Sequence, residues 1–286
     1  MRHLAAAAAA FLLLCVAAAA DAGPVSRRIY PAPTSPLTVT GLPEGIEMVR
    51  VRTGDGLELT GLAVAGRERP VLLVFHGNAS SAADSVRWLQ PLIAQGYGLI
   101  AAEYRGYSGN RGAPDEGGLT TDAAAFLALA RARAAGRPVW VIGHSLGAGV
   151  AFNLAKRERL DALVTVGAFT RLRAMAPKLA RAFMPDGYDN IAALAALDEP
   201  WFLIHGMADP VVPLQQGEAL HEAAGKAGRR GASFVVVGAD HKPDGNAIAA
   251  ILDKLTAYLA TGKLSAEGLP GAIKLVPFGQ TRALNP

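Results

Sequence analysis

Ser145 lies in the pentapeptide Gly143-His144-Ser145-Leu146-Gly147, whose residue types and spacing point directly to nucleophilic catalysis. An apolar run, 137–142, precedes this pentapeptide, and a segment of helical composition, 148–156, follows it. A G-x-S-x-G sequence between a strand and a helix is typical of a nucleophile elbow, a sharp turn that exposes the serine hydroxyl. Side chains at positions 143 and 147 would collide where the backbone doubles back, so glycine is needed at both. The sequence therefore predicts Ser145 as a nucleophile.

A serine hydroxyl needs a general base, and His241 is the histidine that fits this role. It follows an apolar strand, 232–237, and a helix is expected soon after it, so its side chain can reach over the carboxyl edge of a sheet. His76 and His205 each end an apolar run as His-Gly, and we interpret both as packing or turn residues. Only His241 fits the order Ser, Asp, His along the chain.

Asp209 is the expected third member, because it follows the strand 201–205 and so lies at the same edge of the sheet. The Asp-Pro dipeptide at this point also favours a turn by itself, and both roles can hold together. Asp240 is the neighbour of His241 in sequence, but adjacent side chains in an extended loop point apart. The sequence therefore predicts that Asp209 orients the imidazole of His241.

Acyl transfer also requires donors for the developing oxyanion. We predict the amides of Leu146, at the start of the helix after the elbow, and of Asn78, in the loop after the strand 71–75. Gly77 would allow this loop a close approach. To the substrate-binding rim we assign the residues Gly77, Tyr107, His144, Met175 and Leu179.

Met175 and Leu179 belong to a helix expected over 172–184, in which apolar residues recur at helical spacing. They either pack on the domain or form an apolar edge for an acyl chain.

Several further motifs accompany these residues in a fixed order. They are His76-Gly77-Asn78-Ala79, Tyr104-Arg105-Gly106-Tyr107 with Gly109, Pro114-Asp115-Glu116, the pentapeptide around Ser145, Tyr188-Asp189-Asn190, His205-Gly206 with Asp209 and Val212-Pro213, and His241. With them the chain resembles the serine-esterase branch of the α/β-hydrolases. Within this branch it is most similar to the depalmitoylase-like and serine aminopeptidase-like hydrolases and their bacterial relatives. Two residues depart from that pattern, because Asp240 and Ser108 stand where glycine is common.

The expected elements agree with an α/β-hydrolase fold. Two segments, 47–52 and 57–65, are joined by Gly-Asp-Gly and predict an antiparallel hairpin at the sheet edge. From residue 70 strands alternate with helices, which predicts a mostly parallel sheet covered on both faces. The sequence thus predicts an eight-stranded sheet with a minimal cap. The expected strands are 47–52, 57–65, 71–75, 98–103, 138–143, 161–166, 200–205 and 232–237.

The 286 residues divide into four segments by composition. Residues 1–22 have the charged start, apolar run and Ala-Asp-Ala end of a signal peptide, with an uncleaved anchor as the alternative. Residues 23–45 are rich in proline and predict a linker or strap. A hydrolase domain is expected over 46–261, with a short cap insert at 168–198, and a tail without a core of its own over 262–286. We therefore expect an exported protein, periplasmic or secreted.

Composition narrows the classes of partner and cofactor. The net charge is only +4 and the basic residues are scattered, so no nucleic-acid partner is expected. The single cysteine lies in the leader, and no zinc or phosphate-binding motif is present, so we expect no metal and no cofactor. A small-molecule or lipid-like acyl substrate and a monomer are expected, and a peripheral membrane contact stays open.

These residues predict a serine hydrolase that cleaves an ester or a thioester through an acyl-enzyme. One alternative is a peptidase or aminopeptidase of the same fold, which would need a carboxylate pair for the substrate amine. Glu103 and Glu116 are the acidic residues near this edge, and we expect Glu116 to brace the loop 104–109. The other alternative is a non-catalytic binding protein that kept the fold.

Overall fold

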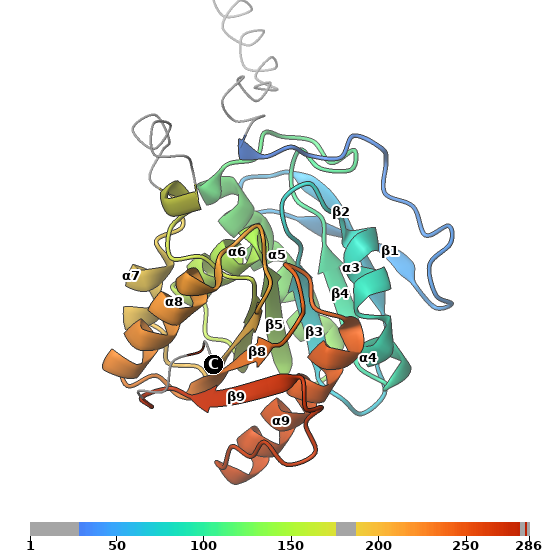
Figure 1. The fold of residues 1–286 in the computed structure, drawn as a ribbon. Helices are drawn as coiled ribbons and strands as arrows, with labels where there is room; N and C mark the ends of the chain where they lie inside the picture. Colours follow the sequence, from blue (N-terminus) through green and yellow to red (C-terminus); the bar gives the residue numbers. More distant parts are fainter. Residues whose placement is uncertain (1–28, 176–186, 281–283, 285–286) are drawn as a thin grey trace, which may run out of the picture.

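Nine strands form one mixed sheet in the computed structural model, which describes residues 29–175, 187–280 and 284. Their spatial order is β1-β2-β4-β3-β5-β6-β7-β8-β9. The six central strands, β4, β3, β5, β6, β7 and β8, run parallel to one another. The hairpin β1–β2 joins one margin and β9 the other, each antiparallel to its neighbour (Figure 1). The strands are β1 (Glu47–Arg52), β2 (Glu58–Val64), β3 (Val71–Phe75), β4 (Gly98–Ala102), β5 (Val139–His144), β6 (Ala162–Val166), β7 (Trp201–Gly206), β8 (Gly231–Val236) and β9 (Ile273–Pro277).

Helices cover both faces of this sheet, because alternate residues of each central strand point to opposite sides. In β3, Leu73 belongs to the apolar cluster that includes residues of α5, α6, α7 and α8, whereas Leu72 belongs to the cluster that includes residues of α3, α4 and α9. Two apolar layers result, one on each face, and the sheet is buried between them. The helices are α3 (Ala82–Trp88), α4 (Gln90–Ala94), α5 (Glu116–Ala134), α6 (Leu146–Ala155), α7 (Asn190–Ala195), α8 (Leu214–Lys226) and α9 (Gly245–Thr261), with the 3₁₀ turn η1 (Leu172–Met175).

The α/β-hydrolase fold with its antiparallel hairpin is confirmed, but the number of eight strands was wrong. The ninth strand, β9, lies within the segment 262–286 that composition predicted to be a tail without a core. It pairs with β8 in the register Val236↔Ile273, and both Ile273 and Val276 are buried. This strand is short and ends in Pro277, a residue that a sheet tolerates at its edge. A pattern of five residues was too weak to be recognised from sequence.

Two predictions fall wholly or partly outside the described residues. The signal peptide, 1–22, is one of them. Of the helix predicted over 172–184, the structure describes only the 3₁₀ turn Leu172–Met175, and Leu179 is not described. Met175 is partly buried against the core, as the packing interpretation expects. In the described ranges, no helix has the length and apolar character needed to cross a membrane.

Candidate active site

Ser145 occupies the sharp turn between β5 and α6 that its pentapeptide predicts. Its backbone has φ 52° and ψ −116°, a conformation that residues other than glycine rarely adopt. A Cβ atom at Gly143 would lie 2.4 Å from the carbonyl oxygen of Gly147, and one at Gly147 would lie 2.1 Å from that of Phe75. The Ser145 amide donates to the Val166 carbonyl of β6 at 2.9 Å. The elbow is therefore held by close backbone packing that only glycine permits.

Asp209 and His241 are brought together from the loops after β7 and β8. The His241 Nδ1 atom lies 2.7 Å from Asp209 Oδ2, and the other carboxylate oxygen accepts from the amides of Val211 and Val212, each at 2.8 Å. The Asp209 side chain is fully buried, and that of His241 is 16 % exposed. A carboxylate fixed by these bonds holds the proton on Nδ1 and leaves Nε2 as an acceptor.

His241 lies beside the elbow as well as beside Asp209. A Cβ atom at Gly167, the residue after the Val166 that binds the Ser145 amide, would be 2.9 Å from His241 Cε1. The rings of His144 and His241 are 4.8 Å apart. Within the described residues, the hydrogen bonds of His241 run to Asp209 and His144, and none joins its ring to the Ser145 hydroxyl. Catalytic hydrogen bonds of this kind often tighten only when substrate is bound.

His144, predicted at the substrate rim, is buried and packs against His241. Its Nε2 atom is 3.0 Å from the carbonyl oxygen of His241, an atom that can only accept, so this nitrogen carries the proton. Burial, followed by the nearby His241, lowers the pKa of His144 to about 3. The ring is therefore neutral at ordinary pH, and it supports the loop that carries His241.

His205 holds the segment that binds the Asp209 carboxylate. It is fully buried, as its packing interpretation expects, and its Nε2 atom lies 2.8 Å from the Val212 carbonyl and 3.6 Å from Asp209 Oδ2. Burial lowers its pKa, which keeps the ring neutral. The segment that anchors the Asp209 carboxylate is thus itself fixed by His205, the second-last residue of β7.

The two segments that carry the predicted oxyanion donors meet at Ser145. Leu146 is the first residue of α6, where a backbone N–H has no partner inside the helix. On the other side, a Cβ atom at Gly77 would lie 2.8 Å from His144 Nδ1 and 3.2 Å from Ser145 Cβ, so the loop approaches the elbow as closely as predicted. Asn78 follows Gly77 and is exposed.

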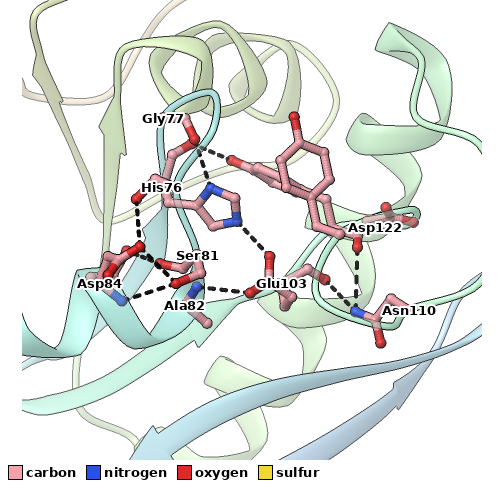
Figure 2. A network of polar contacts seen from close by, with 12 residues as sticks. His76, Gly77, Ser81, Ala82, Asp84, Glu103, Asn110 and Asp122 are labelled. Carbon is pink, nitrogen blue, oxygen red and sulfur yellow. Dashed lines mark hydrogen bonds and ion pairs between the residues drawn. The ribbon is translucent and has the colours of Figure 1, made fainter. Parts of the chain in front are cut away.

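The base of the oxyanion loop is fixed by a buried polar network, which Figure 2 shows around His76 and Glu103. His76 Nδ1 lies 2.8 Å from the Gly77 carbonyl, and its Nε2 lies 2.8 Å from Glu103 Oε1. The other Glu103 oxygen accepts from the Ala82 amide at 2.9 Å, and the Tyr104 hydroxyl donates to the His76 carbonyl at 2.9 Å. Because Gly77 offers only an acceptor, one further proton must lie between His76 and Glu103. Sequence reasoning missed this pair.

We predicted that Glu116 braces the loop 104–109, and this prediction was wrong, because its carboxylate binds elsewhere. Its carboxylate accepts from the Asn153 side chain at 2.7 Å and from the Tyr188 amide at 2.8 Å. The reason is the packing of α5 against α6, which turns the first residue of α5 toward Asn153. Glu116 therefore fixes the backbone at Tyr188, within the predicted cap insert 168–198.

Over the described ranges, no three His, Cys, Asp or Glu side chains come together in a way that could hold a metal ion.

Known proteins resemble the chain in both sequence and fold. Residues 66–189 match the family model described as serine aminopeptidase, S33, and residues 185–270 match the one described as TAP-like protein. A protein of Mycobacterium tuberculosis strain H37Rv described as uncharacterized is 34 % identical over 206 residues, which are 68 % of this chain and 72 % of that protein. Lysophosphatidylserine lipase ABHD12 of Xenopus tropicalis is 32 % identical over 186 residues, which are 55 % of this chain and 47 % of the relative. The chain spans about half the length of the ABHD12 relatives that it matches.

Solved structures share the fold at lower identity. An esterase of Pyrococcus furiosus is 18 % identical with a TM-score of 0.61, over 80 % of this chain and 96 % of the esterase. A puromycin-hydrolyzing peptidase of Mycobacterium tuberculosis is 16 % identical with a TM-score of 0.62, over 80 % of this chain and 41 % of the peptidase. Fold, elbow and relatives agree on the class, a serine hydrolase of the α/β type. The chain belongs to the α/β-hydrolase superfamily, and within this superfamily it matches the S33 and TAP-like families.

Proposed function

We propose that the chain hydrolyses an ester or thioester through an acyl-enzyme. The Ser145 oxygen attacks the acyl carbon while its proton passes to His241 Nε2, and Asp209 stabilises the resulting imidazolium. The backbone N–H groups of Leu146 and Asn78 bind the oxyanion. Collapse of this tetrahedral intermediate breaks the bond to the leaving group, which takes the proton from His241. Water then attacks the acyl-enzyme by the same steps and releases the acyl group. The observation that carries this proposal is the Asp209–His241 pair, 2.7 Å apart beside the elbow.

An ester fits this site better than the free amine of an aminopeptidase substrate. An ammonium group would need carboxylates with free acceptor capacity, and Glu103 and Glu116 were the predicted candidates. Glu103 is fully buried against His76 and Ala82, and Glu116 is occupied by Asn153 and the Tyr188 amide. The relatives named as lysophosphatidylserine lipases support an acyl ester with a lipid-like acyl group.

We further propose export, on the composition of residues 1–22. N-terminal sequencing of the exported chain should find Gly23 first. A chain that still began with Met1 would indicate an anchor instead.

Active-site labelling combined with a substrate panel tests the reaction. A fluorophosphonate should label the unmodified chain and leave Ser145→Ala unlabelled. In a panel of p-nitrophenyl esters, acyl-thioesters and aminoacyl amides, the esters or thioesters should give the highest kcat/KM. Higher kcat/KM on the aminoacyl amides would favour the peptidase, and no labelling of the unmodified chain would favour a binding protein.

A further inference from the structure

A strap of residues 29–37 crosses the edge of the sheet that carries the site, ahead of β1. The strap accepts a hydrogen bond from the Ser108 amide at its Pro33 carbonyl, at 2.8 Å, and returns one from the Leu37 amide to the Ser108 carbonyl, at 3.1 Å. It runs along the top of the molecule in Figure 1, beside the loop that precedes α5. Tyr30 is buried within the core cluster that also holds Tyr107. The strap is therefore docked on the domain.

One further bond joins the strap to the oxyanion loop. The Asn78 side-chain amide donates to the Ile29 carbonyl at 2.5 Å, and its Oδ1 atom accepts from the Tyr107 hydroxyl at 2.8 Å. Burial raises the pKa of Tyr107, so its hydroxyl keeps the proton that it donates. The carboxamide of Asn78 is thus held at both ends, once by the strap and once by the loop after β4.

The oxyanion loop needs such support, because its own backbone is strained. Ala79, the residue after Asn78, has φ 54°, a left-handed conformation that disfavours a residue with a Cβ atom. A strained loop keeps one conformation only when its surroundings fix it. The carboxamide bonds to Ile29 and Tyr107 provide that restraint at the adjacent residue.

We propose that the strap is a positioning element of the active site, acting through Asn78 together with Tyr107. The Ile29 carbonyl orients the Asn78 side chain, which sets the direction of the Asn78 backbone N–H. This inference rests on the proposed function, in which that N–H binds the oxyanion. A loosened donor weakens binding of the transition state more than binding of the substrate, so kcat falls and KM changes little.

Four variants of the full chain separate positioning from general structural support. Asn78→Ala removes both restraints and Tyr107→Phe removes one, while Tyr30→Ala unseats the strap beside Ile29. Tyr30→Phe is the matched control, because it keeps the packing and loses only a 3.4 Å contact between the hydroxyls of Tyr30 and Tyr188. Each is measured for kcat and KM on the best ester, for Ser145 labelling and for its thermal midpoint.

Removing one oxyanion donor costs about 10²- to 10³-fold in kcat, so misplacing one should cost about 10- to 100-fold in Asn78→Ala. Tyr107→Phe and Tyr30→Ala should lose a smaller factor, with KM kept, and Tyr30→Phe should match the unmodified chain. Because the strap acts through Asn78, Tyr30→Ala should lower kcat no further in the Asn78→Ala background.

Two results would overturn the inference alone, with labelling of Ser145 intact. The first is an unchanged kcat in Asn78→Ala and Tyr107→Phe. The second is a double variant in which the effects of Tyr30→Ala and Asn78→Ala multiply, which would make the strap a general structural cover. If Tyr30→Ala does not fold, the Asn78 and Tyr107 variants still decide. An unmodified chain that neither labels nor hydrolyses would overturn the proposed function itself.

Discussion

Replacing Asp209 by asparagine tests the acid of the proposed triad with a minimal change of shape. The amide oxygen can take the place of Oδ1 and still accept from Val211 and Val212, so the loop should remain folded. The amide nitrogen would then face His241 Nδ1, where the carboxylate now lies at 2.7 Å. Since that nitrogen donates, Nδ1 must accept, and the proton moves to Nε2. The imidazole can then no longer take the proton of Ser145.

Two effects set the size of the loss. The wrong tautomer predominates, and the imidazolium of the transition state loses a negative charge. Unit charges about 4 Å apart interact by about 4 kcal/mol at an effective dielectric constant of about 20. Since each 1.36 kcal/mol is about tenfold in rate, the lost charge alone is worth about 10³-fold, and the same substitution in a serine protease lowers kcat about 10⁴-fold, which together set a range of about 10³ to 10⁴. We expect kcat on the best ester to fall by that factor.

Asp240→Asn is the matched control, because Asp240 is the sequence neighbour of His241. It is exposed, and among the described residues its Oδ1 atom accepts the local Lys242 amide at 2.9 Å. Its kcat should stay within about threefold of the unmodified chain, since it touches no reacting group. Steady-state kinetics, with urea unfolding of each variant, measure both. If Asp240→Asn lost more activity than Asp209→Asn, the assignment of the acid would be refuted, while Ser145 and His241 could still act together.

Two further predictions concern the groups beneath the site. The folded-state pKa of His144 is about 3, below its ordinary unfolded value of about 6.5, so the unfolded chain binds more protons between these values and stability falls as pH falls. In His144→Asn the slope of unfolding free energy against pH, from urea titrations across that window, should decrease by up to about 1.4 kcal/mol per pH unit, and an unchanged slope would contradict a neutral buried ring. Glu103→Gln can donate to His76 and still accept from Ala82, so it should stay near the unmodified stability, whereas Glu103→Ala leaves two buried groups unpaired and should cost about 2 to 6 kcal/mol. Equal unfolding free energies for the two Glu103 variants would show that the pair does not support the loop.

The parts of the site that follow from local sequence could be predicted. The elbow is specified by five consecutive residues whose glycines meet backbone atoms directly. Asp209 and His241 each follow an apolar run, and parallel strands place the residues that follow them at one edge. The order Ser, Asp, His along the chain then distinguished Asp209 and His241 from the other candidates. No long-range contact had to be known for these assignments.

The supporting contacts were harder to predict, although one of them had a signal. His76 and Glu103 directly follow Phe75 and Ala102, which are paired in the register of β3 and β4. Two polar residues after paired strand ends should therefore lie side by side, and this could have been inferred once β3 and β4 were taken as neighbours. The bond from Asn78 to Ile29 carried no such signal, because it joins positions 49 residues apart through a backbone carbonyl that every residue possesses.

The supporting contacts lie outside the sequence motifs because each of them restrains a group on a loop from another part of the chain. Ser145, Asp209, His241 and Asn78 lie in turns or loops, and a loop alone cannot hold a side chain or an amide in one direction. Asp209 is fixed by two amides of a segment that the buried His205 contacts at Val212, and the residues before Asn78 are fixed by the buried His76–Glu103 pair. Asn78 itself is exposed, and its side chain is restrained by the buried Tyr107 on the loop after β4 and by Ile29 of the strap. The proposed oxyanion donor Asn78 is therefore where we expect this hydrolase to depend most on a segment outside the sheet and helices.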